Sequence, residues 1–257
     1  MRRVKKRMDS GCVCEQIVYP VPDNADIKTY KKRLRFKTEA DRLAHKERIS
    51  RANFVRMVNE NHSPASLYST LTFDDENELY SFKDARRIRA IYRRRLQRIN
   101  PSAKIIIVMG RGKSTSRIHF HVISLGVTEE DLRKAWTWGS IVESKHLRKH
   151  NRYNGIDHGQ DYTGLANYLF DHWTEEQGGH RYMATRNHKK PEAETPQEVK
   201  REYTVDKPPR APRGYTLVEA KATSFGYLYY KYIKDPEQKE EGGCAGSRRN
   251  PRRCVKL

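Results

Sequence analysis

Two histidines separated by one residue are the sharpest chemical feature of the sequence. His119 and His121 lie in Arg117–Leu125, where polar and apolar residues alternate in a way that predicts a β-strand. Successive side chains on a strand point to opposite faces, so both imidazoles project from one face and Phe120 from the other. A pair of imidazoles on a rigid strand suits a divalent cation. Taken alone, the motif fits two ordinary surface histidines equally well.

A tyrosine in a predicted helix could complete a reactive site. Residues Asp161–Trp173 predict a helix on which Tyr168 shares a face with Asp171 and His172, at spacings of three and four. A tyrosine hydroxyl is a poor nucleophile at its free pKa of about 10, but a cation that polarises a phosphate makes its attack feasible. The histidine pair and Tyr168 together therefore predict a phosphoryl-transfer site. The alternative for Tyr168 is a place in the hydrophobic core.

The elements that must position these residues follow a recognisable order. Strands are predicted at 67–73, 105–109, 117–125 and 140–147, and helices at 84–99 and 128–136. This β-α-β-β-α-β order is the ferredoxin-like arrangement. We therefore expect an α+β fold with an antiparallel sheet that carries helices on one face. The tyrosine-bearing helix would lie near the open face, and a final strand is predicted at 180–186.

The charge of the chain points to a polyanionic partner. The sequence has 52 Lys and Arg against 32 Asp and Glu, a formal net charge of +20, so attraction to nucleic acid would be strong and salt-dependent. A membrane is less suitable, because no run approaches ~18 apolar residues and no basic amphipathic segment precedes an anchor. No apolar segment follows the basic N-terminus, which argues against secretion. The four cysteines, Cys12, Cys14, Cys244 and Cys254, predict reduced thiols.

With these motifs, the chain resembles the rolling-circle replication-associated proteins of phages, plasmids and integrative elements, which belong to the HUH endonuclease superfamily. Ser69–Phe73 resembles the first motif of that family, His119-Phe120-His121 its His-hydrophobe-His motif, and Leu165–His172 its tyrosine motif. The resemblance spans about residues 60–190 of the sequence.

The resemblance implies a metal-dependent enzyme that nicks single-stranded DNA at a replication origin. Tyr168 would be the nucleophile, and His119 and His121 would bind Mg²⁺ or Mn²⁺. The product would be a 5′-phosphotyrosine and a free 3′-hydroxyl that primes synthesis. Two alternatives stay open: a non-catalytic single-stranded DNA-binding regulator, and a relaxase or single-tyrosine transposase with the same chemistry.

The partners implied are origin DNA, a host polymerase and a host helicase, since no G-x-x-x-x-G-K-[ST] motif is present. The expected location is the cytoplasm of a bacterial host, without a membrane partner. The oligomeric state is left open.

Two departures from the family pattern concern the site itself. Many relatives carry Tyr-x-x-Lys, but the residue three after Tyr168 is Asp171. Relatives often place a glutamate on the strand before the histidines, and Val108–Gly112 contains no carboxylate. A third metal ligand must come from elsewhere, and we favour Asp171 or His172 because they share a helix with Tyr168. The full set of candidates is Asp157, His158, Asp161, Asp171 and His172.

Tyr162 is the rival nucleophile. It lies six residues before Tyr168, on a different face of the predicted helix, so we expect one catalytic tyrosine.

Several basic residues are candidates for DNA contacts. Arg111, Lys113 and Arg117 flank the histidine hairpin, and Lys145 and Arg148 could extend the same track. A solvated basic surface is the alternative for each of them.

The expected division of the chain has four parts. Residues 1–62 form a basic N-terminal arm and helix, and 63–190 form the endonuclease domain. Residues 191–234 form a linker and a Tyr-rich segment that packs back, and 235–257 form a disordered tail.

Overall fold

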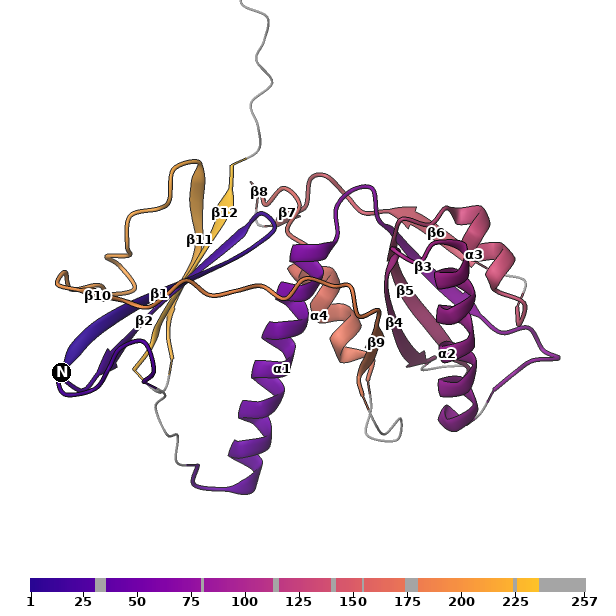
Figure 1. Cartoon of the computed structure of the whole chain (residues 1–257), viewed down its shortest axis with the longest axis horizontal. Helices are drawn as coiled ribbons and strands as arrows, with labels where there is room; N and C mark the ends of the chain where they lie inside the picture. Colours follow the sequence, from indigo (N-terminus) through magenta and orange to yellow (C-terminus); the bar gives the residue numbers. More distant parts are fainter. Residues whose placement is uncertain are drawn as a thin grey trace, which may run out of the picture.

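The chain folds into two antiparallel sheets with two helices between them (Figure 1). We call the sheet that carries the histidines the histidine sheet, and the sheet that joins strands from the two end regions of the chain the terminal sheet. The computed structural model describes residues 1–30, 36–79, 81–112, 116–139, 142–153, 155–173, 180–223 and 226–235.

The histidine sheet has the strand order β6-β3-β5-β4-β9, and every described pairing in it is antiparallel. Its strands are β3 (Leu67–Thr72), β4 (Lys104–Arg111), β5 (Ile118–Leu125), β6 (Val142–His146) and β9 (Tyr182–Ala184). The helices of the described chain are α1 (Glu39–Asn61), α2 (Phe82–Ile99), α3 (Glu129–Ala135) and α4 (Thr163–Asp171). The protein is thus mixed α/β and built on antiparallel sheets.

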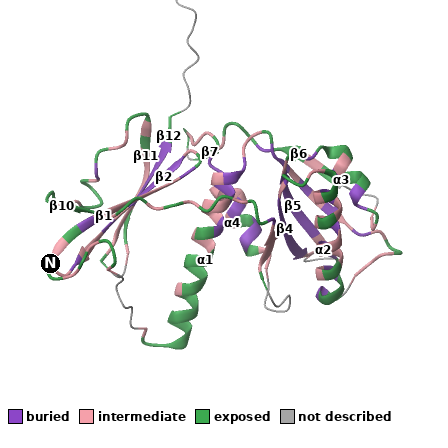
Figure 2. Cartoon of the chain, viewed as in Figure 1, coloured by how far each residue is buried: buried purple, intermediate pink, exposed green. Residues whose placement is uncertain are grey.

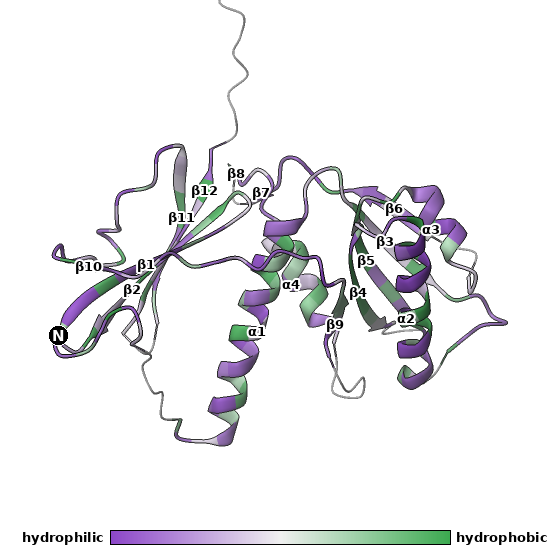
Figure 3. Cartoon of the chain, in the orientation of Figure 1, coloured by the Kyte–Doolittle hydropathy of each residue, from purple (hydrophilic) through white to green (hydrophobic). Residues whose placement is uncertain are grey.

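Side-chain alternation on β4 and β5 gives the histidine sheet two different faces. Ile118, Phe120 and Val122 point into a core shared with α2 and α3. Ile123 and Val108 point the other way, into a core shared with α1 and α4. The strands appear as a hydrophobic layer between hydrophilic helix surfaces, which is clearest beside α2 (Figure 3). His121 alternates with Ile123, so the histidines face α4, as the sequence predicts.

Side-chain caps fix where two of these helices begin. Thr38 starts α1 and Thr128 starts α3, each in a reciprocal capping box with the aspartate three residues later, Asp41 and Asp131. The first half of α1 stands away from the rest of the protein and is exposed (Figure 2), while Phe54 and Val58 near its end are fully buried. Only the second half of α1 therefore supports the site.

The structure corrects the expectation of an N-terminal arm. Residues 1–37 are not an arm, because β1 (Arg2–Ser10) and β2 (Val13–Val21) form a hairpin that turns at Gly11 with a φ of 58°. The hairpin joins the terminal sheet, whose order is β10-β1-β2-β12-β11. The other strands of this sheet are β10 (Gln197–Val199), β11 (Tyr215–Ala222) and β12 (Leu228–Lys234), and a separate short hairpin joins β7 (Arg152–Tyr153) to β8 (Ile156–Asp157).

The region expected to be a linker and packing segment thus supplies three strands of the terminal sheet. The Tyr-rich segment is part of β12, whose Tyr230 and Tyr232 are fully buried. The proposed tail and two cysteines, Cys244 and Cys254, fall outside the described residues apart from Asp235.

The terminal sheet contacts the helices that lie beneath the histidine site. Lys231 of β12 donates to Asp161 Oδ2 at 2.7 Å, and both side chains are nearly buried. Its ammonium also donates to Thr163 Oγ1 at 2.9 Å, on the first residue of α4. Arg56 of α1 forms an ion pair with Glu15 of β2. These contacts tie both ends of the chain to α1 and α4.

In the part of the chain that the structure describes, no helix has the length and apolar character needed to cross a bilayer.

Candidate active site

The histidine pair lies at the centre of the histidine sheet, on strand β5. His119 is opposite Gly110 of β4 and Thr72 of β3, and His121 is opposite Val108 and Thr70. The two Nε2 atoms are 3.1 Å apart. Two nitrogens that each lie ~2.1 Å from one cation at a right angle would be ~3.0 Å apart, so this spacing suits a shared metal ion.

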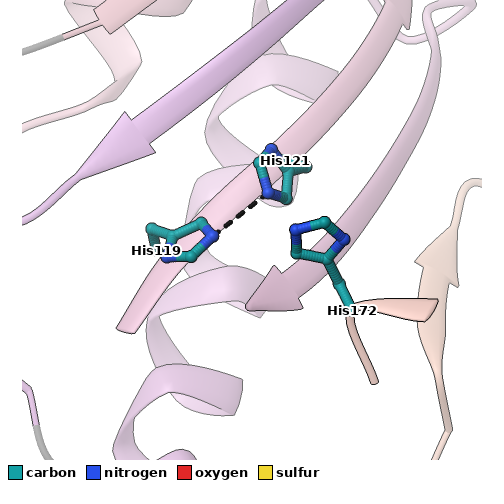
Figure 4. A group of neighbouring side chains, drawn as sticks. All are labelled: His119, His121 and His172. Atoms are coloured by element: carbon teal, nitrogen blue, oxygen red, sulfur yellow. Dashed lines mark hydrogen bonds between the residues drawn. The ribbon is translucent and has the colours of Figure 1, made fainter. Parts of the chain in front are cut away.

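His172 brings a third imidazole to the pair from the end of α4. Potential ligand atoms of the three histidines all lie within 4.8 Å of one another. Figure 4 shows one ring nitrogen of His172 turned toward His121 while the other points away. The nitrogen that points away is Nδ1, which lies 2.8 Å from the carbonyl oxygen of Tyr168. Since Nδ1–H donates to that carbonyl, the Nε2 lone pair is directed toward the other two histidines.

Tyr68 performs the corresponding role for His121. Its hydroxyl lies 2.8 Å from Nδ1 of His121, and Thr70 Oγ1 lies 3.3 Å from the same atom. A proton on Nδ1 that is shared with these oxygens leaves Nε2 of His121 to accept a cation. Burial raises the pKa of Tyr68 to about 12, so its hydroxyl stays protonated.

The environment of the pair keeps its imidazoles neutral. Burial, together with the positive charge that His119 and His172 would carry, lowers the pKa of His121 to about 3. Burial also lowers the pKa of His119, with a smaller contribution from His172. Metal ligation requires neutral imidazole, so this environment prepares the two nitrogens for a cation.

Tyr168 stands beside this group and remains accessible. Its side chain is 50% exposed, and its ring centre lies 4.3 Å from that of His172 and 5.7 Å from that of His121. The ring is therefore not part of the hydrophobic core. Tyr162, the rival, is buried, and its hydroxyl donates to the carbonyl oxygen of Arg148 at 3.2 Å. Of the two phenols, only that of Tyr168 is placed to meet a bound substrate.

A close approach at Gly110 lets the three imidazoles come together. A Cβ at this position would lie 2.5 Å from Nε2 of His119 and 2.9 Å from Cδ2 of His172. Both distances are far below ordinary contact, so only glycine leaves space for the two rings.

Comparison with known proteins places this site within a replication family. Residues 66–177 match the family model for replication-associated proteins of the ORF2 type. The matched segment begins just before β3 and ends beyond α4, so it contains all three histidines, Tyr68 and Tyr168. No curated protein and no solved structure matches the chain. The expected resemblance to replication-associated proteins is confirmed over this segment.

Asp171 occupies the position where many replication-associated proteins carry the motif lysine, and it does not join the histidines. Its Oδ1 accepts a hydrogen bond from Arg51 of α1 at 2.5 Å, and this contact lowers the pKa of the carboxyl group. Arg51 also stacks over Phe170, 4.6 Å from the ring centre. The arginine thus compensates the negative charge that the aspartate brings to this helix.

The other candidates for the third ligand lie elsewhere. Asp157 accepts from His150 at 2.7 Å, and Asp161 pairs with Lys231. Nδ1 of His158 lies 3.8 Å from Asp161. Among the described residues, His172 alone completes a group of three with the histidine pair.

The basic residues expected to contact DNA have different surroundings. Arg111 is half-buried at the end of β4, with its guanidinium 4.8 Å from the ring centre of Phe82. Arg117 is exposed but forms ion pairs with Asp75 at 2.7 Å and Glu78 at 2.8 Å. An arginine with two carboxylate partners is poorly prepared to bind a phosphate.

Lys145 and Arg148 are both exposed. Lys145 pairs with Tyr68 across β3 and β6, so its side chain lies on the same face as the histidines. Lys113 lies outside the described residues.

Sequence reasoning missed Tyr68, Gly110 and Arg51. The signal for Tyr68 was its even spacing from Thr70 within the first motif, which places both residues on one face of β3. Arg51 carried no signal, because the contact between α1 and α4 joins residues 120 positions apart.

Proposed function

We propose that this protein is a metal-dependent endonuclease that nicks single-stranded DNA at a replication origin and starts rolling-circle replication. The observation that carries the proposal is the convergence of His119, His121 and His172 beside the exposed phenol of Tyr168. The match to replication-associated proteins supports DNA as the substrate.

The three histidines would hold one divalent cation through their inward-facing nitrogens. Nitrogen donors suit Mn²⁺ better than Mg²⁺, which prefers oxygen ligands, so we expect stronger binding of Mn²⁺. The bound cation would supply Lewis acidity to a phosphate oxygen. Tyr68 and the carbonyl oxygen of Tyr168 orient the imidazoles, and Gly110 leaves space for them.

Tyr168 would act as the nucleophile. Its phenol oxygen forms a bond to phosphorus while the bond from phosphorus to the 3′ oxygen breaks. The phenol proton passes to solvent, which reaches this half-exposed side chain, and the departing 3′ oxygen takes up a proton. The products are a 5′-phosphotyrosine on the protein and a free 3′-hydroxyl that a polymerase extends.

The supporting scaffold in this proposal is a ferredoxin-like unit of residues 67–147. Numbered within the unit, the strands β3, β4, β5 and β6 lie in the order 4-1-3-2, with α2 and α3 on one face. The other face is left for the histidines and α4. We also propose that residues 63–190 form the endonuclease domain, and that Lys145 and Arg148 contact DNA beside it.

The decisive experiment looks for the covalent product. The protein is mixed with end-labelled single-stranded origin DNA and Mn²⁺, then denatured and separated by electrophoresis. We expect a slow-migrating protein–DNA adduct that is lost in EDTA and lost in Tyr168→Phe, since no other phenol occupies that position.

Tyr162→Phe is the matched control for this experiment. It removes a buried hydroxyl from the start of the same helical segment, so it should still form the adduct. Adduct formation by Tyr168→Phe would overturn the assignment. If the wild-type protein binds the DNA in Mn²⁺ without forming any adduct, the protein is a DNA-binding regulator instead.

A further inference from the structure

Helix α2 carries a group of arginines that the histidine site does not use. Arg86, Arg89 and Arg93 recur at spacings of three and four, so they share one face of the helix. Arg89 lies in the buried stripe of α2 and is 5% exposed. Burial of an arginine to this degree is unusual unless the guanidinium has a partner.

This arginine face lies away from the neighbouring helix α3. On the α3 side, Tyr92 donates to the carbonyl oxygen of Leu132 at 3.5 Å, and Arg95 donates to that of Ala135 at 2.9 Å. At 100° per residue, Arg93 lies on the flank of α2 opposite Arg95. The arginine face therefore borders a side of the helix that α3 does not cover.

Arg89 has no counterion in the described structure. Its Nε and Nη1 atoms are buried without a hydrogen-bond partner, and the same is true of Nε of Arg93. The charges that act on Arg89 come from Arg86 and Arg93, and together with burial they lower its pKa to about 10. A buried cation surrounded by like charge is unfavourable, which indicates that an anion belongs at this position.

We propose that Arg89, together with Arg86 and Arg93, binds a backbone phosphate of DNA. The planar guanidinium matches the oxygens of a phosphate and can donate two parallel hydrogen bonds to it. The net charge of +20 already favours DNA over other anions in reach.

The phosphate bound here is not the one that is cut. Helix α2 packs on the face of the histidine sheet formed by Ile107 and Phe120, whereas the histidines lie on the other face. The arginines thus hold a segment that flanks the nick. The proposal takes DNA as partner from the proposed function but requires no cleavage, so it can succeed where the nicking proposal fails.

Arg89→Met tests the proposal, because methionine fills a buried position without charge. Binding of fluorescent single-stranded and duplex DNA is measured by anisotropy in EDTA at several salt concentrations. We expect the affinity for at least one form of DNA to fall about tenfold. The slope of log K against log salt should fall by about 0.7–0.9, the value for one phosphate contact. The melting temperature without DNA should rise, because an unpaired buried charge is gone.

Arg98→Met is the matched control, since it removes the same charge from an exposed position on the far side of α2. It should cost no more than about twofold in affinity, as expected for a distant screened charge. Equal losses in Arg89→Met and Arg98→Met would show diffuse attraction and overturn the proposal. Unchanged affinity and slope in Arg89→Met would also overturn it.

Two further measurements close the remaining routes. If Arg89→Met does not fold, Arg89→Lys keeps the charge but cannot donate as a planar fork, and it should lose about threefold or more in affinity. Wild-type affinity in Arg89→Lys would then contradict the proposal. Stabilisation of the wild type by inorganic phosphate, with unchanged DNA affinity in the variants, would reassign the arginines to free phosphate and overturn the DNA assignment.

Discussion

The space at Gly110 decides whether three imidazoles can meet. The rings of His119 and His172 lie against its Cα, where a methyl group would overlap both. Glycine is therefore required here by the close approach of side chains and not by its own backbone conformation. The strand position that carries no carboxylate contributes an absence of bulk instead.

Gly110→Ala should disrupt the metal site. The added methyl group must push His119 or His172 away, so we expect the affinity for Mn²⁺ to fall by at least tenfold, with adduct formation reduced in parallel. Isothermal titration calorimetry with Mn²⁺ measures the first effect.

Gly164→Ala is the control for this variant. Its Cβ would meet the hydroxyl of the exposed Tyr153, a flexible group that can move aside. We expect it to keep Mn²⁺ affinity and to stabilise α4 by up to about 1 kcal/mol. Wild-type Mn²⁺ affinity in Gly110→Ala would show that the three histidines are not a single site.

At the scale of elements, the sequence predicts the histidine sheet well and the terminal sheet not at all. Regular alternation identifies β5 and the faces of its residues, and helical spacing identifies α4. The hairpin of β1 and β2 was hidden by its many charges and by Pro20, which suggested an arm. Gly11 between two stretches with hydrophobic residues was the available signal.

The third imidazole shows where sequence reasoning stops. The choice between Asp171 and His172 was left open because both lie on the predicted helix with Tyr168. Packing decides it: Arg51 of α1 binds Asp171, and the last turn of α4 directs His172 toward β5. Neither contact can be derived from spacing within one helix.

Lys231→Met should weaken the connection between the terminal sheet and α4. Loss of the ammonium leaves the Asp161 carboxylate buried without its cation, although Thr163 still donates to it. We expect the free energy of unfolding to fall by about 3–5 kcal/mol in denaturant titrations. Lys221→Met removes an exposed partner of Glu219 in the same sheet and should cost less than about 1 kcal/mol. Similar losses in both variants would argue against a special role for the buried pair.

At the scale of the whole molecule, stability should depend on pH through a second pair of histidines. His62 is buried, with Nδ1 3.2 Å from Ser66 Oγ and Nε2 3.4 Å from Nε2 of His188. Burial, His188 and Lys104 lower the pKa of His62 to about 3. The unfolded chain takes up this proton below about pH 6.5, whereas the folded protein resists it. The stabilisation is therefore complete above pH 6.5 and is lost as the pH falls toward 3.

His62→Gln should reduce this dependence. At pH 5, the wild type should lose about 2 kcal/mol through His62 relative to pH 7, a loss that glutamine does not share. Melting temperatures measured from pH 7 to pH 5 test this, with His146→Gln as a control at an exposed site. Parallel curves for the wild type and His62→Gln would contradict the assignment.

The terminal sheet pairs β2 with β12, and this pairing has a consequence for biosynthesis. Val13–Val21 leaves the ribosome early, but its partner strand, Leu228–Lys234, follows about 200 residues later, on the order of 10–40 s at ordinary elongation rates. Until then the early hairpin has one edge uncovered, and the anchor at the start of the tyrosine helix is missing. A nascent chain thus acquires its histidines and tyrosine before it acquires the support that holds them, and DNA is safe from it until translation is almost finished.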